Sequence, residues 1–191
     1  TSDHGYHLGE HGHWQKRTLF DNATRVPLIV AGPGINKNEK IMGAPVELVD
    51  IYPTLMDLLD MDTPEFVSGK SFAPLLKDSN ARVRESALTE LGVNTGYGAK
   101  VSGYSIKTDR YRLTQWGYNG VLGFELYDHK FDKEELKNLT EVESYKFIKD
   151  SLTKVLSKRI VEAKKQPKGL DFVTDNPQEW REPRQVHSQP K

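Results

Sequence analysis

Alternation of apolar and polar residues is clearest in the second half of the chain. Two alternating segments flank an Asp109-Arg110 turn and predict a β-hairpin. Two further short segments with β-branched, aromatic or leucine residues lie on either side of it. The strands expected there are 87–91, 103–108, 111–116 and 124–128. Consecutive short strands with tight connections predict an antiparallel sheet within residues 86–128.

A helix is expected over residues 144–163, because apolar residues recur there at helical spacing. They are Tyr145, Ile148, Leu152, Val155, Leu156 and Ile160. One apolar stripe of this kind is typical of a helix that packs one face on a core. From Lys164 onward the chain is polar and punctuated by proline, which predicts an extended tail over 164–191.

The first half contains one apolar run and one further helix signal. Residues 26–31 (Val-Pro-Leu-Ile-Val-Ala), closed by Gly-Pro-Gly, predict a buried strand. Asp50 is expected to cap a helix that runs to about Leu59, followed by a loop over 61–71. The side chains expected on the buried side of this helix are Leu55, Met56, Leu58 and Leu59.

These elements together predict an α/β fold in three parts. Residues 1–85 form the end of an α/β sheet sandwiched by helices, and 86–163 a small α+β subdomain with an antiparallel sheet and a closing helix. The tail over 164–191 follows. The sequence does not begin with Met, and we expect it to be the C-terminal piece of a longer protein.

Composition narrows the classes of partner. The 191 residues carry 27 Lys+Arg and 27 Asp+Glu, so the formal net charge is zero and no nucleic-acid partner is predicted. No apolar run approaches the roughly 20 residues of a membrane span. Cysteine is absent, which excludes disulfides and thiolate metal sites within these residues.

Candidate chemistry concentrates in residues 1–16, a glycine-rich segment with two acids and a lysine. Four of the six histidines lie there: His4, His7, His11 and His13. Such a segment is typical of a catalytic or metal-binding loop. Asp3 supplies a hard oxygen suited to Ca²⁺ or Mg²⁺, and histidine suits zinc. Two alternatives remain open from the residues alone, namely a zinc site through His7, His11 and His13 and a solvated histidine-rich run.

The segment Ser-Asp-His-Gly-Tyr-His-Leu-Gly-Glu-His-Gly-His-Trp-Gln-Lys (2–16), continued through 20–28, resembles the second signature region of the type I sulfatases. It is most similar to the iduronate-2-sulfatase-like branch. Further blocks resemble the same family in the same order, over about residues 1–160. These blocks are 48–55, 69–76, 103–112 and 125–128.

The resemblance implies an alkaline-phosphatase-like sheet and a sulfuric ester hydrolase that uses Ca²⁺. Asp3 would be a carboxylate ligand of Ca²⁺ and His4 the neighbouring metal ligand. Lys16 would be the catalytic residue that contacts the sulfate ester. Tyr6 and His11 would lie near the substrate, which we expect to be a sulfated carbohydrate. The resemblance also implies a periplasmic, secreted or lysosomal-type compartment.

One departure from the family limits this expectation. Sulfatases use a formylglycine made from Cys or Ser in a C/S-x-P-x-R context, and no residue here has that context. The family's paired metal-binding aspartates are also missing. We therefore expect an upstream half to supply formylglycine, and we expect these residues alone to be inactive. The alternatives are a phosphonate or phosphate ester hydrolase of the same superfamily and an inert truncated or docking subunit.

Overall fold

The computed structural model describes residues 1–33, 35, 43–78, 80–94, 100–165 and 167–169. Most of the expected tail over 164–191 therefore lies outside the described residues. Among the described residues, no helix is long and apolar enough to cross a membrane.

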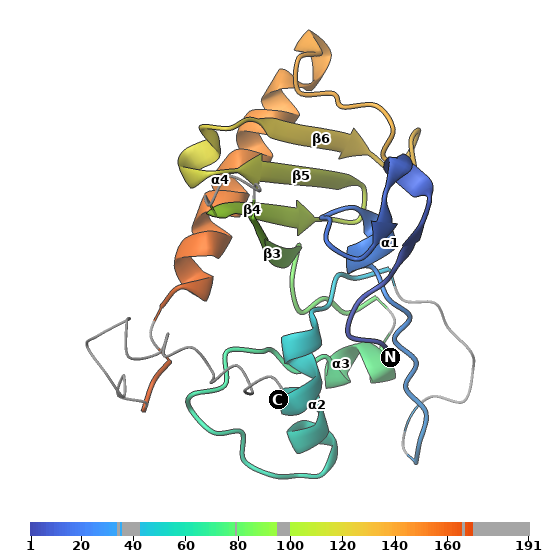
Figure 1. Cartoon of the computed structure of the whole chain (residues 1–191). Coiled ribbons are helices and arrows are strands. Elements are labelled where there is room, and N and C mark those ends of the chain that lie inside the picture. The colour runs from blue at the N-terminus through green and yellow to red at the C-terminus, as the bar shows by residue number, and fades with distance from the viewer. Residues whose placement is uncertain (34, 36–42, 79, 95–99, 166, 170–191) are drawn as a thin grey trace, which may run out of the picture.

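A four-stranded antiparallel sheet occupies the second half of the chain (Figure 1). Its strands lie side by side in chain order and confirm all four predicted strands. They are β3 (Ala87–Asn94), β4 (Lys100–Lys107), β5 (Tyr111–Trp116) and β6 (Phe124–Asp128). Lys107 pairs with Arg112 across the predicted turn. A short 3₁₀ turn, η3 (Tyr118–Gly120), connects β5 to β6.

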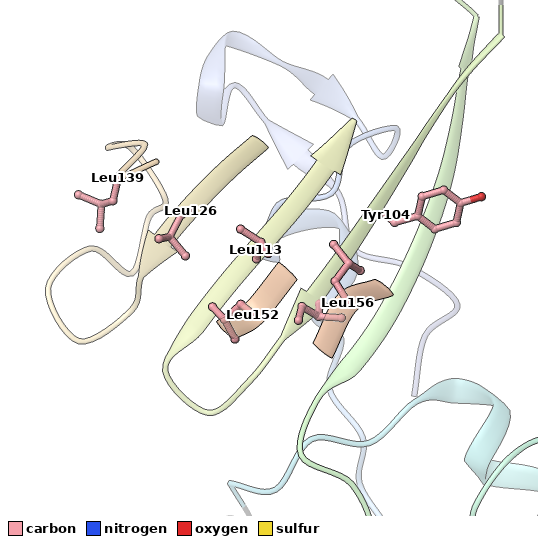
Figure 2. Close-up of a cluster of buried hydrophobic side chains, with 7 residues drawn as sticks. Tyr104, Leu113, Leu126, Leu139, Leu152 and Leu156 are labelled. Atoms are coloured by element: carbon pink, nitrogen blue, oxygen red, sulfur yellow. The ribbon is translucent and has the colours of Figure 1, made fainter. Parts of the chain in front are cut away.

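The predicted helix is also confirmed. It consists of a 3₁₀ turn, η4 (Glu143–Tyr145), and α4 (Lys146–Ala163), which lies across one face of the sheet (Figure 1). Leu152 and Leu156 from its apolar stripe enter the core, whereas Val155 lies at the exposed edge of the stripe. Figure 2 shows how leucines from β5, β6 and α4 converge. The buried residues of this core are Tyr104, Ile106, Leu113, Leu126, Leu139, Leu152 and Leu156.

The opposite face of the sheet is covered by the N-terminal segment. This segment contains β1 (His7–Leu8), the 3₁₀ turn η1 (Glu10–Gly12), β2 (Trp14–Gln15) and α1 (Asp21–Thr24). Side chains alternate across a strand, so Gly103 and Ser105 of β4 point away from α4. A Cβ added at Gly103 would lie 2.5 Å from the Trp116 ring and 2.8 Å from the buried Leu19 side chain. Glycine therefore makes room for both Trp116 of β5 and the N-terminal segment at this position.

The remaining elements form a smaller apolar cluster. They are η2 (Leu48–Asp50), α2 (Ile51–Leu58) and α3 (Ala73–Lys77). Phe72, Leu75 and Leu76 are buried there, with Leu28 and Val30 packed against them. The loop predicted over 61–71 is confirmed, since no helix or strand lies within it.

The strand predicted over 26–31 is wrong for this structure. Residues 25–32 have no assigned secondary structure, and Ile29 is 84% exposed. A strand is defined by hydrogen bonds to a neighbour, and no described segment pairs with this one. The apolar run predicted a buried strand, but its side chains are half-buried or exposed, and no sheet among the described residues includes it.

The expected buried side of α2 is also wrong. Leu55, Leu58 and Leu59 are exposed, and the helix buries Pro53 and Thr54 instead. Periodicity identifies an apolar face, but only the neighbouring elements decide whether that face is covered.

Helix α2 begins after Asp50 as predicted, but the Asp50 carboxylate does not cap it. The carboxylate accepts hydrogen bonds from the backbone N–H groups of Glu47 and Lys70, each at 2.8 Å, and pairs with the Arg84 guanidinium. Glu47 also accepts from Arg84 at 2.6 Å and from Arg159 of α4 at 2.5 Å. These buried charges connect the start of α2 to the sheet subdomain.

Candidate active site

Asp3, His4 and Lys16 lie together at one end of the N-terminal segment. The Lys16 ammonium Nζ is 2.6 Å from Nε2 of His4, and a carboxylate oxygen of Asp3 is 3.3 Å from the same nitrogen. Lys16 follows His4 by twelve residues in sequence. The β1–β2 hairpin reverses the chain between them and brings the ammonium back. The structure thus groups the three residues that the sequence singled out.

Gly5 fixes the start of this loop against α1. Its N–H donates to the carbonyl oxygen of Ala23 at 2.9 Å. A Cβ at Gly5 would lie 1.9 Å from the carbonyl oxygen of Asn22, a contact that no side chain tolerates. Glycine is therefore required for the close approach that holds Asp3 and His4 in place.

The contacts of His4 define its protonation. Nδ1 lies 2.7 Å from the carbonyl oxygen of Gly5, which can only accept, so Nδ1 carries the proton. Nε2 therefore keeps its lone pair, toward which the Lys16 ammonium donates. Slight desolvation raises the pKa of Asp3. Hydrogen bonds from the nearby backbone and attraction to His4 and Lys16 outweigh it, so the pKa lies below its ordinary value.

This donor set fits part of a divalent cation site. A carboxylate oxygen and an unprotonated imidazole nitrogen 3.3 Å apart can serve one cation together. Ca²⁺ takes about six to eight ligands, most of them oxygens. Asp3 and His4 therefore supply a minority of the ligands that Ca²⁺ needs.

Tyr6 and His11 lie in the same segment, but no described contact joins them to Lys16. Tyr6 is exposed. The His11 ring stacks on Phe20 with ring centroids 3.8 Å apart and an interplanar angle of 2°. The structure therefore leaves Tyr6 available to a ligand, while His11 is engaged by an aromatic partner.

The zinc alternative through His7, His11 and His13 is wrong for this structure. The His7 ring meets the other two edge-on, with centroids 5.9 and 5.3 Å away, and His7 is fully buried. In the part of the chain that the structure describes, only Asp21, His129 and Glu135 bring three possible ligand atoms within 4.8 Å of one another.

Sequence reasoning missed this last group, which surrounds the buried Arg112. The Arg112 guanidinium pairs with Asp21 and, at 2.5 Å, with Glu135, while His129 Nε2 lies 2.7 Å from Glu135. Burial raises the pKa of Glu135, but the contacts with His129 and Arg112 prevail and hold it below its ordinary value. Because an arginine already supplies the positive charge, we interpret the group as structural. The only sign of this group in the sequence was Arg112, a charged residue within a strand of alternating apolar and polar residues.

A groove of about 2490 Å³ is lined by Asp3, His4 and Lys16 and by residues 87–91 of β3. Apolar side chains of Val26, Leu28 and other residues of the 26–31 segment line part of it. Ligand pockets usually measure about 300–1,000 Å³. The groove is larger than a typical ligand pocket, and the candidate site forms part of its lining.

Comparison with known proteins places the chain in a family. Residues 9–166 match the family described as N-sulphoglucosamine sulphohydrolase, C-terminal. A sulfatase of Formosa agariphila is 36% identical over 76% of this chain and 26% of its own length. Arylsulfatase K of Gallus gallus is 34% identical over 73% of this chain and 26% of its own length. The chain thus spans about a quarter of the length of these relatives.

Solved structures agree with the sequence comparison. The 2-O glycosaminoglycan sulfatase BT1596 superposes with a TM-score of 0.73 at 29% identity, covering 91% of this chain and 38% of its own. BT4656, solved in complex with its substrate D-glucosamine-2-N,6-O-disulfate, superposes with a TM-score of 0.70 at 25% identity, covering 88% of this chain and 35% of its own. The predicted fold class is confirmed by these neighbours. The chain belongs to the sulfatase family, in the region that corresponds to the N-sulphoglucosamine sulphohydrolase C-terminal domain.

Proposed function

We propose that this chain is the C-terminal part of a sulfatase that hydrolyses sulfate esters of sulfated carbohydrates. The observation that carries the proposal is the grouping of Lys16, His4 and Asp3 within a chain of the sulfatase family. A cationic ammonium beside a partial cation site suits an anionic ester substrate. A carbohydrate substrate is supported by two structural neighbours, one a glycosaminoglycan sulfatase and the other solved with a glucosamine disulfate as its substrate.

In this proposal Asp3 and His4 hold Ca²⁺, and Lys16 contacts the sulfate ester. Bound Ca²⁺ supplies positive charge against the sulfuryl oxygens. Asp3 contributes a carboxylate that is ionised at neutral pH, and His4 would contribute the lone pair of Nε2 in place of its contact with the Lys16 ammonium. The Lys16 ammonium offsets negative charge on the leaving oxygen. Tyr6 and His11 border the substrate.

The proposal also includes a partner for the chain. An upstream half supplies the formylglycine and the remaining metal ligands, and it fills the groove along β3. We propose that the chain is divided into residues 1–85, 86–163 and 164–191. From the sequence resemblance to the sulfatases, we also propose that it belongs to the iduronate-2-sulfatase-like branch. The same resemblance supports a periplasmic, secreted or lysosomal-type compartment.

The test uses the full-length enzyme that carries this chain, with its nucleophile activated, and a sulfated disaccharide as substrate. Lys16→Ala should lower kcat/KM by about 10²–10³-fold, the usual cost of removing one charge-stabilising donor. Lys154→Ala, which removes an exposed lysine of α4, is the matched control and should change kcat/KM less than 3-fold, an effect of about 0.6 kcal/mol. Unchanged activity of Lys16→Ala would contradict the proposal.

Two further arms separate the alternatives. Asp3→Asn should weaken Ca²⁺ binding measured by calorimetry at least about 10-fold, because an ionised ligand is lost. A phosphonate monoester assayed beside the sulfated disaccharide tests the phosphoester alternative, which predicts faster turnover of the phosphonate. No turnover of either substrate would favour the inert docking subunit.

A further inference from the structure

We propose that His7 is a positioning residue for Lys16, a role that rests on the function proposed above. The imidazole does not contact the ammonium. His7 holds the main chain before Lys16 through its backbone pairing with Gln15 and after Lys16 through its imidazole contact with Thr18, so that the Lys16 side chain reaches His4 rather than solvent.

The first hold is the strand pair that leads into Lys16. His7 of β1 is paired with Gln15 of β2, and Lys16 follows directly. Gly9 and His13 close the hairpin with a further backbone hydrogen bond of 3.1 Å. The pairing of His7 with Gln15 therefore fixes where the main chain enters Lys16.

The second hold comes from the His7 side chain. Nε2 lies 2.6 Å from the hydroxyl oxygen of Thr18, and the Thr18 N–H donates to the Lys16 carbonyl oxygen at 2.9 Å. The turn that carries Lys16 thus spans from Gln15 to Thr18. Both of its ends are attached to one residue, His7.

Burial makes this attachment rigid. His7 is 0% exposed, and the rings of His11, His13 and Phe20 meet it edge-on at centroid distances of 5.9, 5.3 and 6.3 Å. A side chain packed on several sides keeps one rotamer. Burial, together with repulsion from His13 and His11, lowers the pKa of His7, although the nearby backbone and charge of Glu10 act in the opposite sense. Neutral imidazole is the form that this packing favours.

The backbone before Lys16 needs such support. Gln15 has a φ of 82°, in the left-handed region that a non-glycine residue rarely adopts. Conformations of this kind persist only where the surroundings over-determine them, and they gather at functional sites. At Gln15 the turn redirects the chain out of β2 and toward His4, and the two holds on His7 keep it there.

The experiment is a double-mutant cycle in the full-length enzyme, with kcat on a sulfated disaccharide as the readout. His7→Leu and Thr18→Val should each lower kcat by about 10–10²-fold, the effect of misplacing a catalytic group by about 1 Å. His7→Gln, whose amide can reach the Thr18 hydroxyl, should recover most of the loss. In the Lys16→Ala background His7→Leu should have no further effect, because there is no ammonium left to position.

Controls separate positioning from folding. Thr153→Val removes a hydroxyl of α4 that bonds only to its own helix, and kcat should stay within 3-fold of the parent enzyme. Thermal unfolding of every variant checks that the enzyme is folded, and His7→Gln and Thr18→Val keep the test valid where His7→Leu does not fold. Multiplicative losses in the cycle, or a folded His7→Leu enzyme with normal kcat, would overturn the positioning role alone. An active Lys16→Ala enzyme would overturn the proposed function and, with it, this role.

Discussion

The two regions of this chain bury their apolar side chains to very different degrees. In the sheet subdomain, Ile106, Leu113, Leu126 and Leu156 are completely inaccessible to solvent. In the region that contains α2, by contrast, Leu59 is 66% exposed and Ile29 is 84% exposed. The sheet and α4 cover each other, whereas the first region has only a small buried cluster around Phe72, Leu75 and Leu76 and leaves Leu55, Leu58 and Leu59 of α2 exposed.

This difference shows where the candidate site obtains its rigidity. Asp3, His4 and Lys16 belong to the less buried region, but their segment is attached to the sheet. The Arg112 group joins α1 to β5, and Glu47 joins the start of α2 to α4 through Arg159. The subdomain that lacks the candidate site therefore acts as the support on which the site is built.

Arg112→Ala should break this support and have the largest effect. It removes the guanidinium that faces the buried carboxylate of Glu135 and the half-buried carboxylate of Asp21. Leaving such charges unpaired costs about 3–5 kcal/mol of unfolding free energy. Urea unfolding of the 191-residue chain measures it.

Arg25→Ala is the matched control, because Arg25 also pairs with Asp21, at 3.8 Å, but is 79% exposed. Exposed pairs contribute about 0–1 kcal/mol. Equal costs for the two substitutions would mean that Arg112 does not join the regions.

The same contrast explains what the sequence could predict. The hairpin, β6 and α4 were predictable because the elements against which their apolar faces pack lie close by in the same sequence. The strand over 26–31 and the buried face of α2 were mispredicted because an apolar pattern does not reveal whether anything lies opposite it.

The candidate site was predictable only in part. Asp3, His4 and Lys16 were found through the family resemblance, and the hairpin that joins them is local in sequence. The Arg112 group was missed because Asp21 and Arg112 are 91 residues apart, and only the packed sheet brings them together. The contact between His7 and Thr18 was missed because one buried histidine does not alter the pattern of apolar and polar residues along the sequence.

Acid should affect the two regions differently, although carboxylates in both have lowered pKa values, among them Asp3 in the first region and Asp128 in the sheet subdomain. Hydrogen bonds from Arg110 lower the pKa of Asp128 to about 2 against desolvation, with Lys130 and Tyr145 assisting. Its folded-state pKa lies below the unfolded value near 4, so its contribution to stability is complete above about pH 4 and is lost as pH falls toward 2. The expected loss is about 1–2 kcal/mol, reduced because Arg110 is partly exposed.

Urea unfolding between pH 2 and 5 measures this loss. Asp128→Asn should reduce the pH dependence, with the buried Glu135 carboxylate contributing the rest, whereas Asp3→Asn should leave it intact, because Asp3 is exposed and solvent screens its contacts. A pH dependence that survives in Asp128→Asn and disappears in Asp3→Asn would reverse the assignment of acid sensitivity to the sheet subdomain.

Leu59→Ala should have the smallest effect in the 191-residue chain, under about 0.5 kcal/mol, because its side chain is already mostly in water. Leu156→Ala makes the same chemical change in the core and should cost about 2–5 kcal/mol.

Repeating both measurements with the upstream half joined should raise the cost of Leu59→Ala to about 1.5–3 kcal/mol if that half covers α2, since burying a leucine is worth about that much. The cost of Leu156→Ala should not change, because its surroundings are complete. A Leu59→Ala cost that stays near zero in the joined protein would show that the apolar face of α2 remains exposed, and the upstream half would then have to contact the chain through the groove along β3 alone.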